Sequence, residues 1–208
     1  MKKTPRIAAP ALLSVAVVWG AAFVLMKPAI DQQPFYDFLA TRFTVATLIM
    51  ILARPKVVTE LNWDLIKRGI PLGILLALGY ITQTIALELT TAAITGFLTG
   101  LYVVLTPVLG YFFFRKKLDR RVLIGVVLAT IGLALLSLNG LSVEPGQVWG
   151  IACALLFAAH IVALGAWSPG KNVYVLTVLQ LGTMAVINWV GALVNDGSYQ
   201  SPPNWDVW

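Results

Sequence analysis

The sequence contains few charged side chains and almost none of the residues that bind metals. Asp, Glu, Lys and Arg make up 12% of the 208 residues, about half of their usual share in soluble domains. His160 is the only histidine and Cys153 the only cysteine, so the chain can form neither an internal disulfide bond nor a cluster of His and Cys metal ligands. It has no HExxH motif and no phosphate-binding glycine loop. We therefore expect no metal, no cofactor and no enzymatic activity, and an intramembrane enzyme is the least favoured alternative.

The rest of the composition is typical of a membrane protein. Hydrophobic residues make up 59% of the chain and the mean hydropathy is +0.84. The 15 Lys and Arg and 9 Asp and Glu residues are too few to cover a soluble globule of this length. We therefore expect a lipid bilayer as the partner, and we attribute the net charge of +6 to membrane topology rather than to nucleic-acid binding. Cys153 lies in an apolar run and is interpreted as a small core residue.

Long apolar runs predict an all-α, polytopic membrane bundle of seven transmembrane helices. A helix rises about 1.5 Å per residue, so about 20 apolar residues cross the hydrocarbon core of a bilayer. The first run is too long for the core of a signal peptide and is interpreted as an uncleaved span. The expected spans are residues 7–26, 34–53, 70–88, 93–114, 122–138, 147–167 and 173–194.

The basic residues predict how these spans are oriented. With seven spans, all Lys and Arg residues except Lys27 and Arg42 fall at the N-terminus or in the loops on its side of the membrane. Short loops rich in Lys and Arg stay on the cytoplasmic side. We expect a multi-pass protein of the bacterial inner (plasma) membrane, with the N-terminus in the cytoplasm and the C-terminus of this chain outside.

Polar side chains follow one face of the third and of the fourth span. In the fourth span they recur at steps of four, three and four, which places them on one side of a helix. Such faces either line a cavity or bond back to carbonyls of their own helix. The fourth-span set is Thr95, Thr99, Tyr102 and Thr106, and the third-span set is Tyr80, Gln83, Thr84 and Glu88.

Two backbone features are expected in the fourth span. Gly96 and Gly100 form a small-xxx-small pair that lets another helix approach closely. Pro107 cannot donate to the carbonyl of Val103, which predicts a kink there.

Arg42 lies deep in the second span, where a charge is costly unless it faces a partner or water. We expect it to line a cavity, where it could bind the carboxylate of a solute. The alternative is a structural bond to backbone carbonyls or to Asp37. Glu88 lies at the outer end of its span and is interpreted as a solvated helix end rather than as a proton-coupling group.

Three further residues are candidates for the same cavity. His160 lies in the middle of the sixth span, where it is either a functional group or a satisfied core histidine. Gln180 belongs to a polar stripe of the seventh span. Trp19 lies deep in the first span, where it either stacks on a solute or packs in the core.

Three segments resemble the EamA-type drug/metabolite transporter superfamily. They are VVWGAAFVLMKPAI (17–30), FLATRFTVATLIM (38–50) and the segment 85–136. The resemblance implies two five-helix repeats of opposite orientation with a central cavity between them. Residues 1–140 then form the first repeat, and residues 147–208 form two helices and a tail of an incomplete second one. This predicts a shortened chain that does not transport by itself.

The resemblance implies a transporter that moves a small organic metabolite by alternating access. The alternative is a non-transporting membrane subunit or interaction protein, in which the polar faces are contacts between helices. A second copy of the chain, in a homodimer, is a further expected partner. The expected cavity residues are Trp19, Arg42, Tyr80, Gln83, Thr84, Thr95, Thr99, Tyr102, Thr106, His160 and Gln180.

Overall fold

The computed structural model describes residues 8–114, 120–137 and 144–202, and every regular element within these ranges is a helix. This confirms the predicted all-α class. In chain order the elements are α1 (Ala8–Ile30), α2 (Phe35–Ala53), the short 3-10 helix η1 (Pro55–Val58), α3 (Trp63–Leu89), α4 (Ala92–Gly100), α5 (Tyr102–Phe114), α6 (Arg120–Ser137), α7 (Pro145–Trp167) and α8 (Val173–Asp196).

The terminal N–H and C=O groups of a helix lack partners within the helix. Several helices here therefore begin at a capping side chain or end at a glycine. The Asn62 side chain accepts a hydrogen bond from the N–H of Leu65 at the start of α3, and the Thr91 hydroxyl accepts one from the N–H of Ile94 at the start of α4. Gly197 ends α8 with a φ of 68°, in the left-handed region that favours glycine. The chain therefore turns back at this point.

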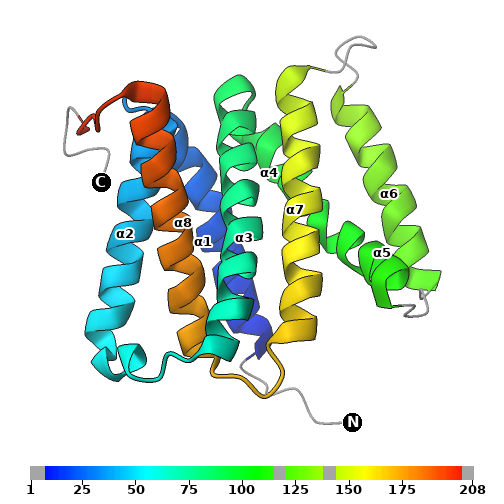
Figure 1. The fold of residues 1–208 in the computed structure, drawn as a ribbon. Coiled ribbons are helices and arrows are strands. Elements are labelled where there is room, and N and C mark those ends of the chain that lie inside the picture. The colour runs from blue at the N-terminus through cyan, green and yellow to red at the C-terminus, as the bar shows by residue number, and fades with distance from the viewer. Residues whose placement is uncertain (1–7, 115–119, 138–143, 203–208) are drawn as a thin grey trace.

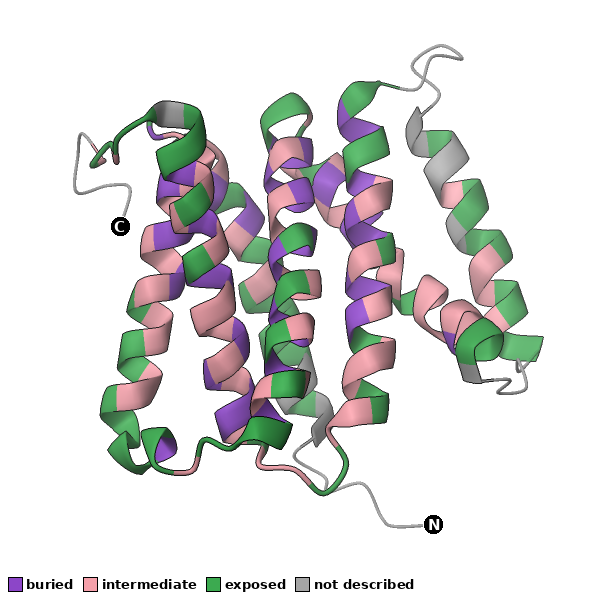
Figure 2. Ribbon diagram, viewed as in Figure 1, coloured by how far each residue is buried: buried purple, intermediate pink, exposed green. Residues whose placement is uncertain are grey.

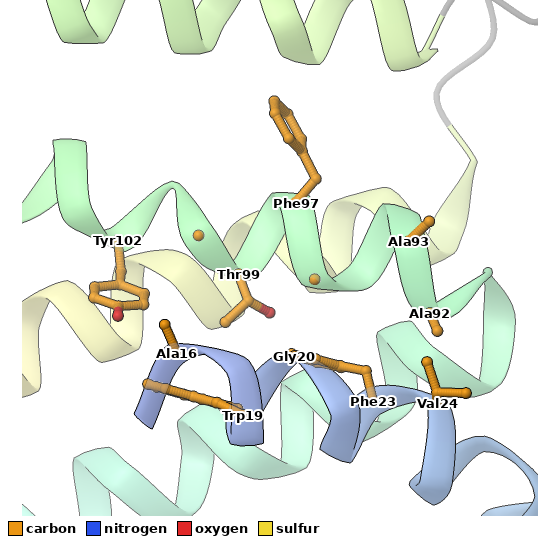
Figure 3. Close-up of a pocket in the computed structure, with 12 residues that line it drawn as sticks. Ala16, Trp19, Gly20, Phe23, Val24, Ala92, Ala93, Phe97, Thr99 and Tyr102 are labelled. Atoms are coloured by element: carbon orange, nitrogen blue, oxygen red, sulfur yellow. The ribbon is translucent and has the colours of Figure 1, made fainter. Parts of the chain in front are cut away.

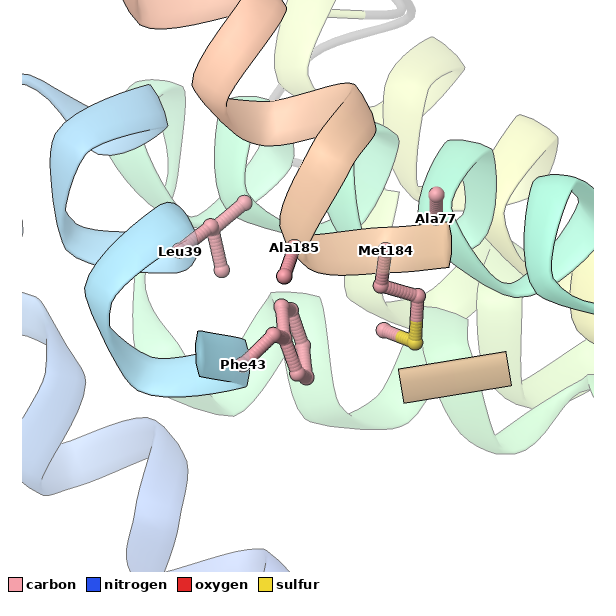
Figure 4. Packing of buried hydrophobic residues seen from close by; sticks show 5 residues of the cluster. All are labelled: Leu39, Phe43, Ala77, Met184 and Ala185. Carbon is pink, nitrogen blue, oxygen red and sulfur yellow. The ribbon is translucent and has the colours of Figure 1, made fainter. Parts of the chain in front are cut away.

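Four helices stand side by side in the order α2, α8, α3, α7, with α1 behind them and α6 at one edge (Figure 1). Buried residues concentrate where the four helices face one another, whereas α6 is largely exposed (Figure 2). One core cluster joins three of the helices, with Leu39 and Phe43 from α2, Ala77 from α3, and Met184 and Ala185 from α8 (Figure 4). The packing of α3 against both α7 and α8 makes it the centre of the bundle.

Six of the described segments are long and apolar enough to cross a membrane: α1, α2, α3, α4 with α5, α7 and α8. The predicted fifth span, residues 122–138, falls mainly on α6, which is not among the six, and its last residue lies outside the described ranges. A multi-pass helical protein is therefore supported, and the count of seven spans is not confirmed.

The predicted fourth span is divided at Leu101 into α4 and α5, which together run obliquely behind α7 (Figure 1). The N–H of Leu101 bonds to the carbonyl of Leu98, three residues back, so the helix tightens there. This interruption is not the predicted kink at Val103 and Pro107, which stays a prediction. The interruption precedes both residues, and α5 continues through Pro107.

The connections between helices lie at two opposite ends of the bundle. The α2–α3 and α7–α8 connections share one end, and the α1–α2 and α3–α4 connections share the other (Figure 1). At the first end Lys171 pairs with Asp64 at 2.7 Å, Arg54 pairs with Glu60 at 2.6 Å, and the Asn172 amide donates to Glu60. The Arg54–Glu60 pair lies within the α2–α3 connection, whereas the contacts of Lys171 and Asn172 join the α7–α8 connection to the start of α3 and to the α2–α3 connection.

Candidate functional site

An open groove of about 450 Å³ lies between α1 and α4 (Figure 3). Small side chains leave its space free, and aromatic rings form much of its wall. Phe97 turns its ring away from α1, whereas Trp19, Thr99 and Tyr102 are directed into the space between the two helices (Figure 3). The lining residues are Ala16, Trp19, Gly20, Phe23, Val24, Ala92, Ala93, Gly96, Phe97, Thr99, Gly100 and Tyr102.

Glycines on α4 keep this groove open rather than drawing two helices together. An added Cβ at Gly100 would meet no atom of the described residues within 4 Å, and one at Gly96 would lie 3.7 Å from the ring of Phe23. The expectation that Gly96 and Gly100 allow a close helix contact was therefore wrong. The observed close contacts use glycines of other helices. A Cβ at Gly73 or Gly79 on α3 would overlap Thr183 of α8 or Phe157 of α7.

Four aromatic rings meet at the deep end of the groove. Trp19 stacks on Tyr102, with 5.9 Å between ring centroids and 24° between ring planes. Phe157 of α7 presents an edge to both rings, at centroid distances of 6.1 and 6.3 Å, and to Tyr80 of α3 at 5.4 Å. Residues from α1, α3, α5 and α7 thus form one aromatic cluster, which includes the predicted residues Trp19, Tyr80 and Tyr102.

Arg42 lies behind this cluster in a narrow crevice of about 10 Å³. Its guanidinium donates to the Sδ atom of Met26 at 2.9 Å and lies 5.8 and 5.9 Å from the ring centroids of Phe43 and Tyr80. Within the described parts of the chain, no ion pair includes Arg42. The crevice residues are Trp19, Ala22, Phe23, Met26, Arg42, Tyr80 and Gln83.

Asp37 is not the partner of Arg42, although it lies on the same helix. Its carboxylate is fully buried, and Oδ2 accepts a hydrogen bond from the N–H of Gln200 at 2.9 Å. The amide of Gln33 donates to the carbonyl of Gln200 at 2.7 Å, so residues that follow α8 return onto the start of α2. Sequence reasoning missed this buried acid because its position at a span end predicts exposure to solvent.

Gln83 and Thr99 join α3 to α4 beside the groove. The Gln83 amide donates to the Thr99 hydroxyl at 3.3 Å, and that hydroxyl lies 3.7 Å from the Cys153 sulfur on α7. All three side chains are buried, as predicted for Cys153. This polar contact borders both hollows, because Thr99 lines the groove and Gln83 lines the crevice.

The other predicted cavity residues lie outside the lining of these two hollows. Thr84 and Thr106 donate to the carbonyls of Tyr80 and Tyr102 in their own helices, as membrane-embedded hydroxyls commonly do. Thr95 is buried against the hydroxyl of Thr90 at 2.9 Å. Their role in a cavity stays a prediction.

His160 and Gln180 pair with each other between α7 and α8. Nε2 of His160 lies 2.7 Å from Oε1 of Gln180, and the Gln180 amide donates to the carbonyl of Leu176. Both side chains are buried. This arrangement agrees with a satisfied core histidine, one of the two alternatives that the sequence left open. Glu88 is exposed at the end of α3, which agrees with its interpretation as a solvated helix end.

The two hollows offer groups that can bind a solute. Their lining combines aromatic rings with the guanidinium of Arg42, the amide of Gln83 and the hydroxyls of Tyr80, Thr99 and Tyr102. Among the described residues, no group of three or more His, Cys, Asp or Glu side chains is placed to hold a metal ion.

Comparison with known proteins supports a transporter. Residues 6–138 match the EamA-like transporter family. An uncharacterized transporter of Archaeoglobus fulgidus is 35% identical over 170 residues, which cover 81% of this chain and 52% of that protein. A probable amino-acid metabolite efflux pump of Salmonella typhimurium is 33% identical over 181 residues, covering 81% and 53%. The chain thus spans about half the length of these curated relatives. No solved structure gives a significant match.

Proposed function

Because the chain belongs to the EamA-like transporter family, we propose that it forms part of a transporter that moves small organic metabolites across the inner membrane by alternating access. The observation that carries this proposal is the groove between α1 and α4, which meets the crevice of Arg42 at Trp19 and Phe23. A cavity that combines apolar walls with a few polar groups is typical of small-molecule sites. The name of the Salmonella relative, an efflux pump, favours export.

The proposed architecture contains seven spans, with α6 as the additional one, in an inverted repeat of five and five helices. Residues 1–140 form the first repeat and residues 147–208 belong to the second. The matched regions cover only 52% and 53% of these relatives, which leaves room for the rest of a second repeat. A homodimer is an alternative way to cover the open side of the groove.

The proposed orientation places the α2–α3 and α7–α8 connections in the cytoplasm and Ser198 outside. In support, both connections lie at the same end of the bundle and carry most of the described loop cations (Figure 1). Single cysteines introduced by Thr59→Cys or Ser198→Cys, in a Cys153→Ala background, separate the two sides. Both positions are exposed in the structure. An impermeant maleimide is expected to label the Ser198→Cys protein in intact cells and the Thr59→Cys protein only after lysis. Labelling of Thr59→Cys alone in intact cells contradicts the orientation.

Transport is tested by solute flux into vesicles. The 208-residue chain and the same chain lengthened by the downstream reading frame are reconstituted separately, and uptake of labelled organic acids, amines and amino acids is measured. Saturable flux is expected from the longer protein and little from the shorter one, because alternating access needs both sides of the cavity. Absence of saturable flux from both proteins contradicts transport. Equal flux from both contradicts only the need for a complete second repeat.

A further inference from the structure

We propose that the site formed by the groove and the Arg42 crevice binds amphipathic monocarboxylates in preference to neutral solutes and to zwitterions. This inference rests on the proposed transport function and names the substrate class of the same site. The carboxylate binds the Arg42 guanidinium, and the apolar body of the solute occupies the groove between α1 and α4.

The described contacts of Arg42 leave its charge unpaired. They are a thioether sulfur and two aromatic rings, none of which carries a negative charge. Asp37, the acidic residue of the same span, is bonded to the backbone of Gln200 instead. A guanidinium within a span costs several kcal/mol unless it has a partner. The planar guanidinium matches a carboxylate with two parallel hydrogen bonds. The anion that Arg42 lacks in the protein is therefore supplied by the solute.

The groove has room for the body of the solute. Its volume of about 450 Å³ is within the range of sites that enclose small organic ligands. Part of its wall is formed by the rings of Trp19, Phe23 and Tyr102. Another part is formed by small residues of α4, including Gly96 and Gly100. Rings facing a flat open strip accept a phenyl or a similar apolar group.

Two aromatic side chains lie between the two hollows. Trp19 and Phe23 line both the groove and the crevice, so their side chains separate the guanidinium from the open space. The crevice of about 10 Å³ has no room for a carboxylate until one of these rings moves. Trp19 is half-buried, and its indole N–H has no hydrogen-bond partner among the described residues. When Trp19 turns aside, it therefore loses contacts with the neighbouring rings but no hydrogen bond to the described residues.

The lining of the two hollows disfavours amino acids as solutes. None of the described side chains that line the groove or the crevice is acidic. A zwitterion would place its ammonium group beside Arg42 without a carboxylate to receive it, and a desolvated unpaired charge is costly. The site thus differs from one built for amino acids, which needs an acceptor for the ammonium group as well as a cation.

Three probes of similar shape test this inference: hydrocinnamate, its neutral amide hydrocinnamamide, and phenylalanine, which adds an ammonium group. Binding to the full chain in lipid nanodiscs is measured by equilibrium dialysis. Hydrocinnamate is expected to bind about tenfold to a hundredfold more tightly than either of the other probes, because a hydrogen bond to a charged partner is worth that much. Equal affinity for hydrocinnamate and its amide overturns the inference. So does phenylalanine binding as tightly as hydrocinnamate, or no binding of hydrocinnamate at millimolar concentration.

Variants assign the preference to one residue. Arg42→Gln is expected to remove the preference for hydrocinnamate over its amide, and Arg42→Lys to keep part of it. The matched control is Lys67→Gln. This change removes a cation that lies over the ring of Trp63 near the start of α3. An Arg42→Gln protein that keeps the full preference overturns the inference. Selective binding of hydrocinnamate without flux of any labelled solute would contradict the proposed transport but not the carboxylate site. Flux of neutral solutes without selective binding of carboxylates would contradict the carboxylate site but not the proposed transport.

Discussion

Replacing Gly79 with alanine is expected to destabilise the protein by about 2 kcal/mol, within the usual range for overpacking a dense core. The added Cβ would lie 2.5 and 2.6 Å from two ring carbons of Phe157, closer than real Cβ contacts occur. Phe157 cannot retreat freely, because its ring is buried against Trp19, Tyr80 and Tyr102. Chemical unfolding in detergent, followed by tryptophan fluorescence, measures the loss of stability.

Two controls show whether the effect comes from this one contact. Gly165→Ala makes the same change on α7, where an added Cβ meets no atom within 4 Å in the part of the chain that the structure describes, and is expected to leave stability unchanged or slightly higher. Adding Phe157→Leu to Gly79→Ala makes room for the new methyl group and is expected to restore part of the loss. Equal stabilities of the Gly79→Ala and Gly165→Ala proteins would refute the packing of α3 against α7 described above.

Replacing His160 with leucine is expected to destabilise the protein by about 1–3 kcal/mol, the cost of leaving a buried polar group without a partner. The change removes the 2.7 Å contact with Gln180 and leaves Oε1 of that amide without this partner between α7 and α8. Interhelical hydrogen bonds in membranes are often worth less, which places the expected value at the lower end of this range. The measurement is the same chemical unfolding.

The matched control for His160→Leu is the double change His160→Leu with Gln180→Leu. Removal of both partners leaves no unpaired group from this contact, so the double variant is expected to be more stable than the single one. A folded double variant that retains hydrocinnamate binding is also expected, since neither residue lines the groove or the crevice. If the double variant loses more stability than the two single variants together, the result contradicts a simple paired contact.

The positions of the helices and the inward direction of several polar residues could be predicted from the sequence. Apolar runs of about 20 residues define membrane helices, and the cost of polar groups in lipid directs residues such as Gln83 and Thr99 inward. Arg42 and Trp19 are recognisable for the same reason, because each is an unusual side chain deep in an apolar span.

The partner of each polar face could not be predicted, because helical periodicity gives a direction but not the neighbouring helix. Thr95 and Thr99 share a face and are both buried, yet Thr95 meets Thr90 whereas Thr99 borders the groove. Likewise, the burial of Asp37 depends on the turn at Gly197 that returns Gln200 to α2. Such long-range contacts leave no local pattern in the sequence.

The contacts between the α2–α3 and α7–α8 connections have a kinetic consequence. In the pair that links them directly, the Lys171 and Asp64 side chains are 33% and 48% exposed, so water and salt screen the attraction. Exposed pairs of this kind are worth about 0–1 kcal/mol each. Breaking the Lys171–Asp64 pair therefore adds little to the activation barrier for separating the two connections. The rate at which this end of the bundle opens is set by the packing of α3 against α7 and α8, and it should change only weakly with ionic strength.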